Sequence, residues 1–197
     1  MLKNSDELNG MREAGKLAAE VLEMITDYVK PGISTGELDE ICFKYITDVQ
    51  KAIPANVGYR GFEKTLCTSI NQVICHGIPD TNRILKSGDI MNIDVTVIKD
   101  GWHGDTSKMF LIGKAQSHNE RLVRVTQECL YKGIEAARPG ARLGDIGNAI
   151  QIHAEKNYYS VVEEYCGHGI GKIYHDEPQI LHYGEPNTGQ EIIEGMC

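Results

Sequence analysis

The 197-residue sequence predicts an α/β fold of the α+β kind, in which helices cover an antiparallel sheet and a unit of two helices followed by strands occurs twice. Three observations predict it. Apolar residues recur at helical spacing in two pairs of segments. A run of β-branched and apolar residues at 90–97 leads into Asp100-Gly101, a strong hairpin signal. Several motifs of the first half return in the same order in the second half.

The first pair of helices is defined by its ends. Apolar spacing from Ser5 to Val29 predicts one amphipathic helix, which Lys30-Pro31-Gly32 stops. Ser34-Thr35-Gly36-Glu37 matches a capping box, and the apolar residues that follow to Ile46 favour a second helix. Strands and loops are expected from 55 to 79, and then a hairpin that runs to about 112.

The second pair of helices follows the same order. Ser117-His118-Asn119-Glu120 is another capping box, and the helix it opens ends at Arg138-Pro139-Gly140. A fourth helix is expected from 143 to 154. We therefore expect one domain, 1–197, with repeat halves at about 5–112 and 117–197.

The repeat is visible in the residues themselves. Val29–Leu38 is echoed by Ala137–Ile146 at an offset of 108, and Lys86–Ile90 by Ile193–Cys197 at an offset of 107. Cys75-His76-Gly77-Ile78 also resembles Gly167-His168-Gly169-Ile170. The counterpart of Asp94 would be position 201. We therefore expect the second half to be incomplete, with its last strands missing beyond a truncated C-terminus.

Asp94 and Asp105 stand eleven residues apart on either side of the Lys99-Asp100-Gly101 turn. Antiparallel pairing would place them opposite each other, or within about one residue of opposite. A carboxylate in an apolar strand costs several kcal/mol unless it is paired or binds a cation. Because two facing carboxylates repel, the hairpin predicts half of a metal site.

Composition and charge favour a soluble globular protein over a nucleic-acid-binding or membrane protein. Hydrophobic residues make up 41% and charged residues 24%, as in soluble globular proteins. The net charge of −8 argues against nonspecific nucleic-acid binding, and no run approaches a membrane span or a leader, so we expect a cytoplasmic protein. Six cysteines without a C-x-x-C pair favour free thiols over disulfides or a structural zinc site.

The residues around each histidine indicate whether it has a role in a site or an ordinary structural role. His168 lies between glycines, which let the backbone present an imidazole at a defined angle, and His175 and His76 occur in related motifs. Structural roles are expected for the other four histidines, which are His103, His118, His153 and His182. The glycines around His168 lack the setting of a phosphate loop, and Ser107 lacks the partners of a nucleophilic serine.

Several motifs together resemble one family closely, over essentially the whole chain. They are the Lys-Pro-Gly turn, Cys75–Pro79, Asn92–Thr96, Gly101–Ser107, Tyr165–Gly171 and His175–Pro178. They resemble the type I methionine aminopeptidases. The resemblance implies the pita-bread fold, a unit duplicated about a pseudo-twofold axis. It also implies removal of the initiator methionine from nascent proteins whose second residue is small.

The resemblance implies a role for each matching residue. Asp94, Asp105 and His168 would bind two divalent metal ions, which could be cobalt, manganese, iron, nickel or zinc. In that family a water or hydroxide held between the metals attacks the scissile carbonyl. His76 would lie near the scissile amide, and His175 would hydrogen-bond the substrate carbonyl or the oxyanion. Two further glutamate ligands would follow position 197.

The resemblance also implies a methionine pocket of Tyr59, Phe62, Cys67 and Tyr174, whose aromatic rings suit a thioether. Asn71 and Val73 match positions that hold a monovalent cation through the backbone in some members. The chain departs from the family at Arg60 and Glu63, where histidine and proline are more usual, so the pocket rim is expected to differ.

The expected partners are N-terminal methionyl peptides, with a transient ribosome contact and a monomeric state. Two alternatives remain open: a related pita-bread peptidase of the prolidase or aminopeptidase P type, and a catalytically silent binding protein of the same fold. Asp94, Asp105 and His168 argue against the silent protein. The chain as it stands is expected to be inactive, because it lacks the two glutamates.

Overall fold

The computed structural model describes residues 1–2 and 4–197. They divide into two compact units. The first unit is Ser5–Asn119 with Gly171–Ile173, and the second unit is Met1–Asn4, Glu120–Ile170 and Tyr174–Cys197.

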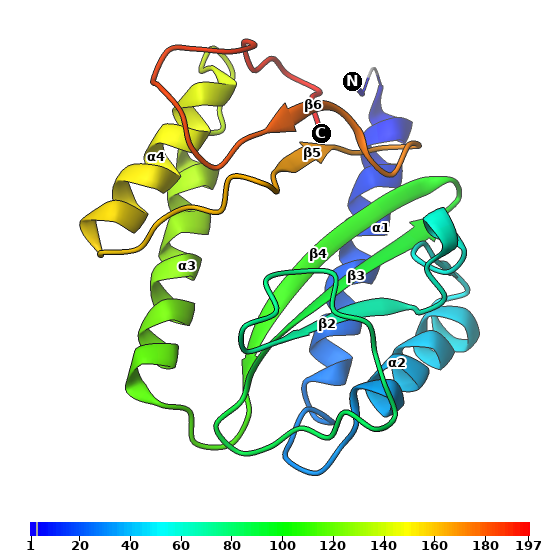
Figure 1. The fold of residues 1–197 in the computed structure, drawn as a ribbon. Coiled ribbons are helices and arrows are strands. Elements are labelled where there is room, and N and C mark those ends of the chain that lie inside the picture. Colours follow the sequence, from blue (N-terminus) through cyan, green and yellow to red (C-terminus); the bar gives the residue numbers. More distant parts are fainter. Residues whose placement is uncertain (3) are drawn as a thin grey trace. The chain divides into compact units, whose positions relative to one another are not determined.

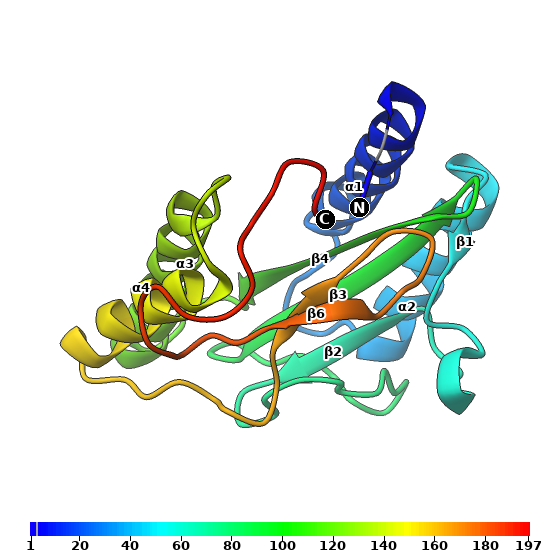
Figure 2. The same ribbon diagram turned by 90° about the horizontal axis from the view of Figure 1, so that it is seen from above.

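The first unit is a four-stranded antiparallel sheet with two helices on one face (Figures 1 and 2). The helices are α1 (Ser5–Ile25) and α2 (Thr35–Lys44), and a π-helical turn, Tyr45–Val49, extends α2. The strands are β1 (Ile53–Pro54), β2 (Leu66–Ile70), β3 (Ile90–Lys99) and β4 (Trp102–Leu111), with a 3₁₀ turn, Tyr59–Gly61, before β2. Strand β3 is central, because it pairs with all three other strands.

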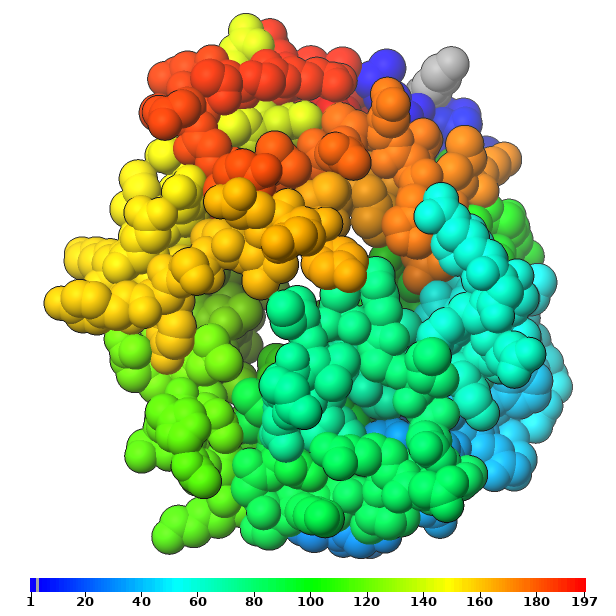
Figure 3. All heavy atoms as spheres, in the orientation of Figure 1, coloured from blue at the N-terminus to red at the C-terminus, as the bar shows by residue number. Residues whose placement is uncertain are grey.

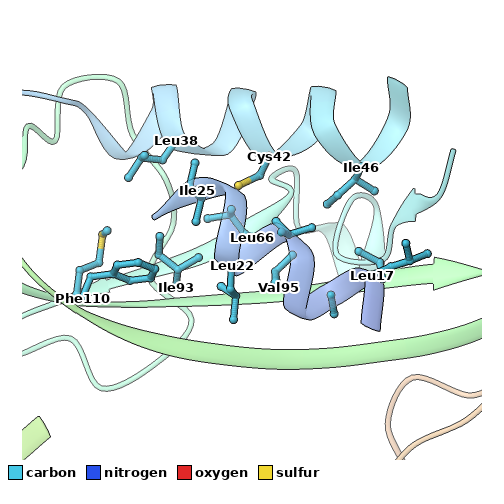
Figure 4. Close-up of a cluster of buried hydrophobic side chains, with 14 of the residues drawn as sticks. Leu17, Leu22, Ile25, Leu38, Cys42, Ile46, Leu66, Ile93, Val95 and Phe110 are labelled. Atoms are coloured by element: carbon cyan, nitrogen blue, oxygen red, sulfur yellow. The ribbon is translucent and has the colours of Figure 1, made fainter. Parts of the chain in front are cut away.

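The core of the first unit lies between the helices and the sheet (Figure 4). Strand β3 presents Met91, Ile93, Val95 and Val97 to the core, since alternate residues of a strand share one face. Leu22 and Ile25 of α1 and Leu38 and Cys42 of α2 pack against the same cluster. The opposite face of the sheet therefore carries the intervening residues of β3, including Asp94.

Helix α1 is shorter than predicted, because it ends at Ile25 rather than near Val29. The Thr26 hydroxyl donates to the carbonyl of Leu22 at 2.7 Å, and the Tyr28 amide closes a tight turn to the carbonyl of Ile25 at 2.9 Å. A threonine that hydrogen-bonds the preceding helical turn competes with helix propagation. The apolar spacing continues past the end of the helix, so a prediction from this spacing alone puts the end too late.

The capping box of α2 is confirmed. The Glu37 amide donates to the Ser34 hydroxyl at 3.1 Å, and the Ser34 amide donates to the Glu37 carboxylate at 2.9 Å. Both side chains thus satisfy amides at the helix start that have no partner within the helix.

The β3–β4 hairpin closes through a two-residue turn. Lys99 pairs with Trp102, and both Asp100 (φ 50°) and Gly101 (φ 82°) have the positive φ angles of a type I′ turn. This register puts Asp94 opposite Ser107 and Asp105 opposite Thr96. The expectation that the two aspartates lie within one residue of opposite is therefore wrong. They are diagonal neighbours, two positions apart on the same face.

The second unit contains the second helix pair and a short hairpin (Figure 1). Most of α3 (Ser117–Ala136) and all of α4 (Leu143–Lys156) belong to it, close to the predicted bounds. Val125 and Cys129 of α3 pack with Ala154 of α4. Strands β5 (Gly167–Gly169) and β6 (Asp176–Ile180) pair antiparallel, with a bulge after His168.

The repeat appears in the hydrogen bonds of each unit. The Gly32 amide donates to the Leu85 carbonyl at 2.9 Å, and the Gly140 amide donates to the Ile192 carbonyl at 2.9 Å. Isolated bridges join Ser34 to Ile84 and Arg142 to Glu191. The first residue of each contact recurs 108 residues later and its partner recurs 107 residues later, the same offsets as in the sequence repeat.

One element of the predicted repeat does not correspond in structure. His168 lies on strand β5, whereas His76 lies in a loop with a positive φ of 56°. The similarity of Cys75–Ile78 to Gly167–Ile170 is therefore not a structural equivalence.

Within the described part of the chain, no helix combines the length and the apolar character that crossing a membrane requires.

Candidate metal centre

Asp94 and Asp105 form a hydrogen-bonded carboxyl pair on the face of the sheet that α1 and α2 leave uncovered. Burial, and then the negative charge of Asp105, raise the pKa of Asp94 to about 7. Two carboxyl groups in contact form a suitable donor set for a divalent cation, because the cation supplies the positive charge that the pair lacks. The pair fits the metal site that the sequence predicts.

Cys67 on β2 pairs directly with Asp94 on β3. Its side chain is buried, and burial, with the nearby Asp94 carboxylate, raises the pKa of the thiol to about 12. The thiol is therefore neutral at physiological pH. A neutral, polarisable sulfur is a suitable wall for an apolar side chain.

Tyr59 and Phe62 are half-buried in the turn that precedes β2. The Gly58 amide donates to the Phe62 carbonyl at 2.7 Å, and the Phe62 amide donates to the Tyr59 carbonyl at 2.9 Å, so the turn is closed on itself. Arg60 adopts a positive φ of 49°, and its guanidinium lies 5.3 Å from the centre of the Tyr59 ring. The residue that departs from the family pattern therefore packs on a predicted pocket residue.

His76 is exposed in a loop that is fixed on strand β2. The Thr68 amide donates to the Gly77 carbonyl at 2.7 Å, and the Gly77 amide donates to the Ser69 hydroxyl at 3.2 Å. A Cβ atom at Gly77 would overlap the Thr68 carbonyl, so glycine alone permits this approach. The loop, coloured teal to green, lies at the surface in Figure 3.

Asn71 and Val73 precede this loop. The Asn71 side chain accepts the Ile90 amide at 3.0 Å and donates to Asp89 at 2.8 Å, while the Val73 amide donates to the Ile70 carbonyl at 3.1 Å. These bonds order the backbone here, and the monovalent cation remains a prediction.

His168, Tyr174 and His175 gather on the β5–β6 hairpin of the second unit. The ring of His175 lies 4.4 Å from that of His168 and 4.1 Å from that of Tyr174, centre to centre. The Nδ1 atom of His168 donates to the Gly169 carbonyl at 2.9 Å, which leaves the lone pair of the neutral imidazole on Nε2. Such a backbone contact fixes the tautomer of a histidine that ligates metal through Nε2.

Within residues 1–2 and 4–197, no three His, Cys, Asp or Glu side chains form a group that could hold a metal ion. The two aspartates belong to the first unit, and His168 belongs to the second. The assignment of all three as ligands of one centre therefore stays a prediction, and so do the roles of His76 and His175.

Among the histidines expected to be structural, His153 donates a 2.8 Å hydrogen bond from Nε2 to the Glu128 carboxylate, between α3 and α4. Burial lowers the pKa of His182. His103 contacts Gly171, a residue 68 positions away. No spacing in the sequence indicated this last contact, although both residues lie in motifs of the family.

A surface cavity of about 310 Å³ lies beside α2, with Asp39, Phe43, Val57 and Lys64 in its wall. None of the predicted site residues lines it. Asp39 accepts the amides of Thr65 at 2.8 Å and Leu66 at 3.2 Å, so this carboxylate supports the start of β2.

The fold and the carboxyl pair are those expected of a metallopeptidase. Residues 9–197 match the model of metallopeptidase family M24, and the chain belongs to that family. Its relatives include methionine aminopeptidases from Salmonella typhimurium, 59% identical, and Escherichia coli, 57% identical. Each match covers 99% of this chain and 74% of the relative.

Solved structures of similar proteins have the same fold. Methionine aminopeptidase from Rickettsia prowazekii superposes with a TM-score of 0.97 at 54% identity, over 100% of this chain and 78% of that chain. Prolidase from Pyrococcus furiosus, at 18% identity and a TM-score of 0.82, shares the fold alone, over 99% of this chain and 55% of that one. The pita-bread fold implied by the sequence is confirmed.

Proposed function

We propose that the protein is a methionyl aminopeptidase that removes the initiator methionine from nascent proteins whose second residue is small. The relatives that are 57–59% identical are methionine aminopeptidases. The observation that carries the proposal is the Asp94–Asp105 pair, two carboxyl groups in contact on one face of the sheet, whose repulsion a divalent cation would relieve.

In this proposal, Asp94, Asp105 and His168 hold divalent metal of the cobalt, manganese, iron, nickel or zinc type. When bound, the metal supplies Lewis-acid polarisation of the scissile carbonyl and lowers the pKa of water. Asp94 and Asp105 remain ionised beside it, and the Gly169 carbonyl holds the His168 ring in the tautomer that ligation requires.

The substrate's methionine side chain would lie against Cys67, Tyr59, Phe62 and Tyr174. The neutral Cys67 thiol offers no charge to solvate, and it lies across the strand from Asp94. In the proposed site, Cys67 would therefore form a part of the pocket wall beside the carboxyl pair. Sulfur–aromatic contacts of this kind favour a thioether over a branched aliphatic side chain.

His76 would contact the scissile amide, and His175 would donate to the carbonyl oxygen as negative charge develops on it. The contacts of the His175 ring with His168 and Tyr174 restrict its orientation, which reduces the reorganisation needed in the transition state. A cytoplasmic, monomeric enzyme that contacts the ribosome transiently would meet its substrate as it emerges.

The test is metal-dependent release of methionine from Met-Ala and Met-Gly peptides, with Leu-Ala as the matched control. The assay compares the chain as it stands with a chimera in which the last quarter of a relative follows Cys197. The chimera should release methionine with Co²⁺, Mn²⁺ or Fe²⁺ and lose activity in chelator. No methionine release by the chimera with any of these metals would refute the proposal.

A further inference from the structure

The surface cavity of about 310 Å³ beside α2 belongs to the first unit alone. Its walls come from three segments of that unit, which are α2, the chain between 57 and 65, and the loop at Thr81. None of the residues assigned to the candidate metal centre or the methionine pocket lines it. It is therefore a separate feature of the molecule.

Two walls of this cavity are held on α2 by direct contacts. The Asp39 carboxylate accepts the amides of Thr65 at 2.8 Å and of Leu66 at 3.2 Å, which fixes the chain before β2. At the start of the helix, a Cβ atom on Gly36 would overlap the backbone of Thr81. The cavity thus has its shape before a ligand enters, and this lowers the entropic cost of binding.

The lining of the cavity carries more negative than positive groups. It contains three carboxyl groups and one ammonium group, those of Asp39, Glu40, Glu63 and Lys64. Glu40 pairs with Lys44 at 2.9 Å, whereas no salt bridge within the described part of the chain includes Asp39 or Glu63. Asp39 is only 8% exposed, and its burial raises its pKa although the two amides oppose that change. A cation in the cavity would offset the cost of burying this carboxylate.

Two apolar side chains lie in the wall beside these carboxyl groups. Phe43 is 42% exposed and Val57 is 45% exposed. A hydrocarbon stem that ends in a cationic head, as in arginine and lysine, matches such a lining. Arginine matches it better, because its planar guanidinium binds carboxylate oxygens in pairs and stacks on an aromatic ring.

We propose that this cavity binds an arginine side chain of a partner protein, with the guanidinium between Asp39 and Glu63 and the methylene stem against Phe43 and Val57. Charge complementarity selects this occupant, since the ligand brings the positive charge that the lining lacks. The inference does not depend on the proposed peptidase activity, because the two sites share no residue.

The experiment is an NMR titration of the ¹⁵N-labelled chain with the peptide acetyl-Gly-Arg-Gly-amide. Its matched control carries citrulline, which has the shape of arginine without the charge. We expect the arginine peptide to shift the backbone amides of Lys64, Thr65 and Thr81 in a saturable manner. The corresponding lysine peptide should bind more weakly, and the citrulline peptide should leave these amides in place.

Three outcomes of this titration would overturn the inference. The first is equal shifts with the citrulline peptide. The second is saturable shifts that lie only outside the cavity, or no saturable shifts at all. The third is binding of the lysine peptide or of spermidine at least as tight as that of the arginine peptide, which would assign the cavity to an ammonium ligand.

A charge-removing variant tests the role of Asp39. Asp39→Asn keeps an oxygen that can accept the amides of Thr65 and Leu66, and we expect it to weaken binding of the arginine peptide at least about fivefold. Glu13→Gln, at an exposed position of α1 outside the cavity, should bind as the wild type does. Wild-type affinity in Asp39→Asn would overturn the inference.

Circular dichroism checks that the variants are folded. Should Asp39→Asn unfold, the double variant Phe43→Ala with Glu63→Gln provides the same test, because it changes only exposed side chains of the cavity. It removes the stem contact and one carboxylate, so we expect it to weaken binding of the arginine peptide at least about fivefold. Unchanged binding by the double variant would overturn the inference.

Discussion

Asp105 lies diagonally across the β3–β4 hairpin from Asp94, and the two carboxyl groups share a hydrogen bond. The type I′ turn at Asp100-Gly101 sets this offset of two positions. A directly opposed pair would bring the carboxylates closer still and increase their repulsion. The diagonal arrangement leaves both side chains on one face of the sheet.

Asp94→Asn should stabilise the metal-free protein and weaken its metal binding. At pH 8, above the raised pKa of about 7, the wild-type Asp94 is ionised, and the folded state carries the cost of that charge. We expect the variant to raise the midpoint of metal-free thermal unfolding by at least about 2 °C and to lose more Co²⁺ affinity than the roughly 10–100-fold typical of supporting residues.

The control for this prediction is Asp27→Asn, which changes an exposed aspartate of the same unit. It should move neither the unfolding midpoint nor the Co²⁺ affinity. An Asp94→Asn variant that is less stable than the wild type without metal would show that the pair is not strained by its own charge.

Gly104→Ala should destabilise the protein, because a Cβ atom there would overlap the backbone carbonyl of Ala14 on α1. Relieving such an overlap requires the helix to move off β4, at a cost of about 1–3 kcal/mol. Gly15→Ala is the matched control. Gly15 follows Ala14 on α1, and no atom lies within 4 Å of its ideal Cβ position. Alanine there should stabilise by about 0.5–1 kcal/mol. Urea unfolding measures both, and equal effects would contradict this packing of α1 on the sheet.

Ser34→Ala should lower the free energy of unfolding by about 1 kcal/mol, because it removes the acceptor of the Glu37 amide at the start of α2.

The contact from the Ser34 amide to the Glu37 carboxylate depends on pH. The hydrogen bonds from Ser34 lower the pKa of Glu37 below its usual 4.5, so their contribution is present above that pH and is lost as the pH falls through the lowered value.

Glu37→Gln should therefore flatten the acid limb of the stability curve below about pH 5, while Glu23→Gln, at an exposed position on α1, should not. Urea titrations at several pH values measure this difference. An acid limb of unchanged slope in Glu37→Gln would contradict the capping box.

Iodoacetamide at pH 8 should alkylate Cys197 in the folded chain long before Cys67 or Cys42. Burial raises the pKa of all three thiols, but Cys197 is exposed to the reagent, whereas Cys42 and Cys67 are buried and their pKa values rise to about 12. Peptide mass mapping after a short exposure measures the order. Early alkylation of Cys67 would contradict a neutral thiol beside Asp94, and labelling in urea provides the control in which the three react alike.

Local chemistry made much of the fold predictable. The hydrogen bonds of a capping box and the backbone angles of an Asp-Gly turn depend on residues close together in the chain. The start of α2 at Ser34 and Glu37 and the turn at Asp100 could therefore be predicted. The predicted register is wrong because a turn of Lys99-Asp100-Gly101 shifts it by one residue, whereas Lys99 pairs with Trp102. One residue more or less in a turn shifts every pair along the hairpin.

Contacts between distant residues had no signature in the sequence. The bond between His103 and Gly171 joins positions 68 apart and depends on how α1, β4 and the 171–173 turn pack, not on any residue spacing. The sequence accordingly predicts only an ordinary structural role for His103. The pairing of Cys67 with Asp94 likewise follows from sheet register, and only the resemblance to a family had linked the two residues to one site.

The central claim is that Asp94, Asp105 and His168 bind one metal centre, and anomalous diffraction from Co²⁺-soaked crystals of the chain tests it most directly. The account predicts an anomalous peak within about 2.0–2.2 Å of a carboxylate oxygen of each aspartate and of the Nε2 atom of His168. A peak bound by the aspartates without His168, or no peak at the carboxyl pair, would contradict it.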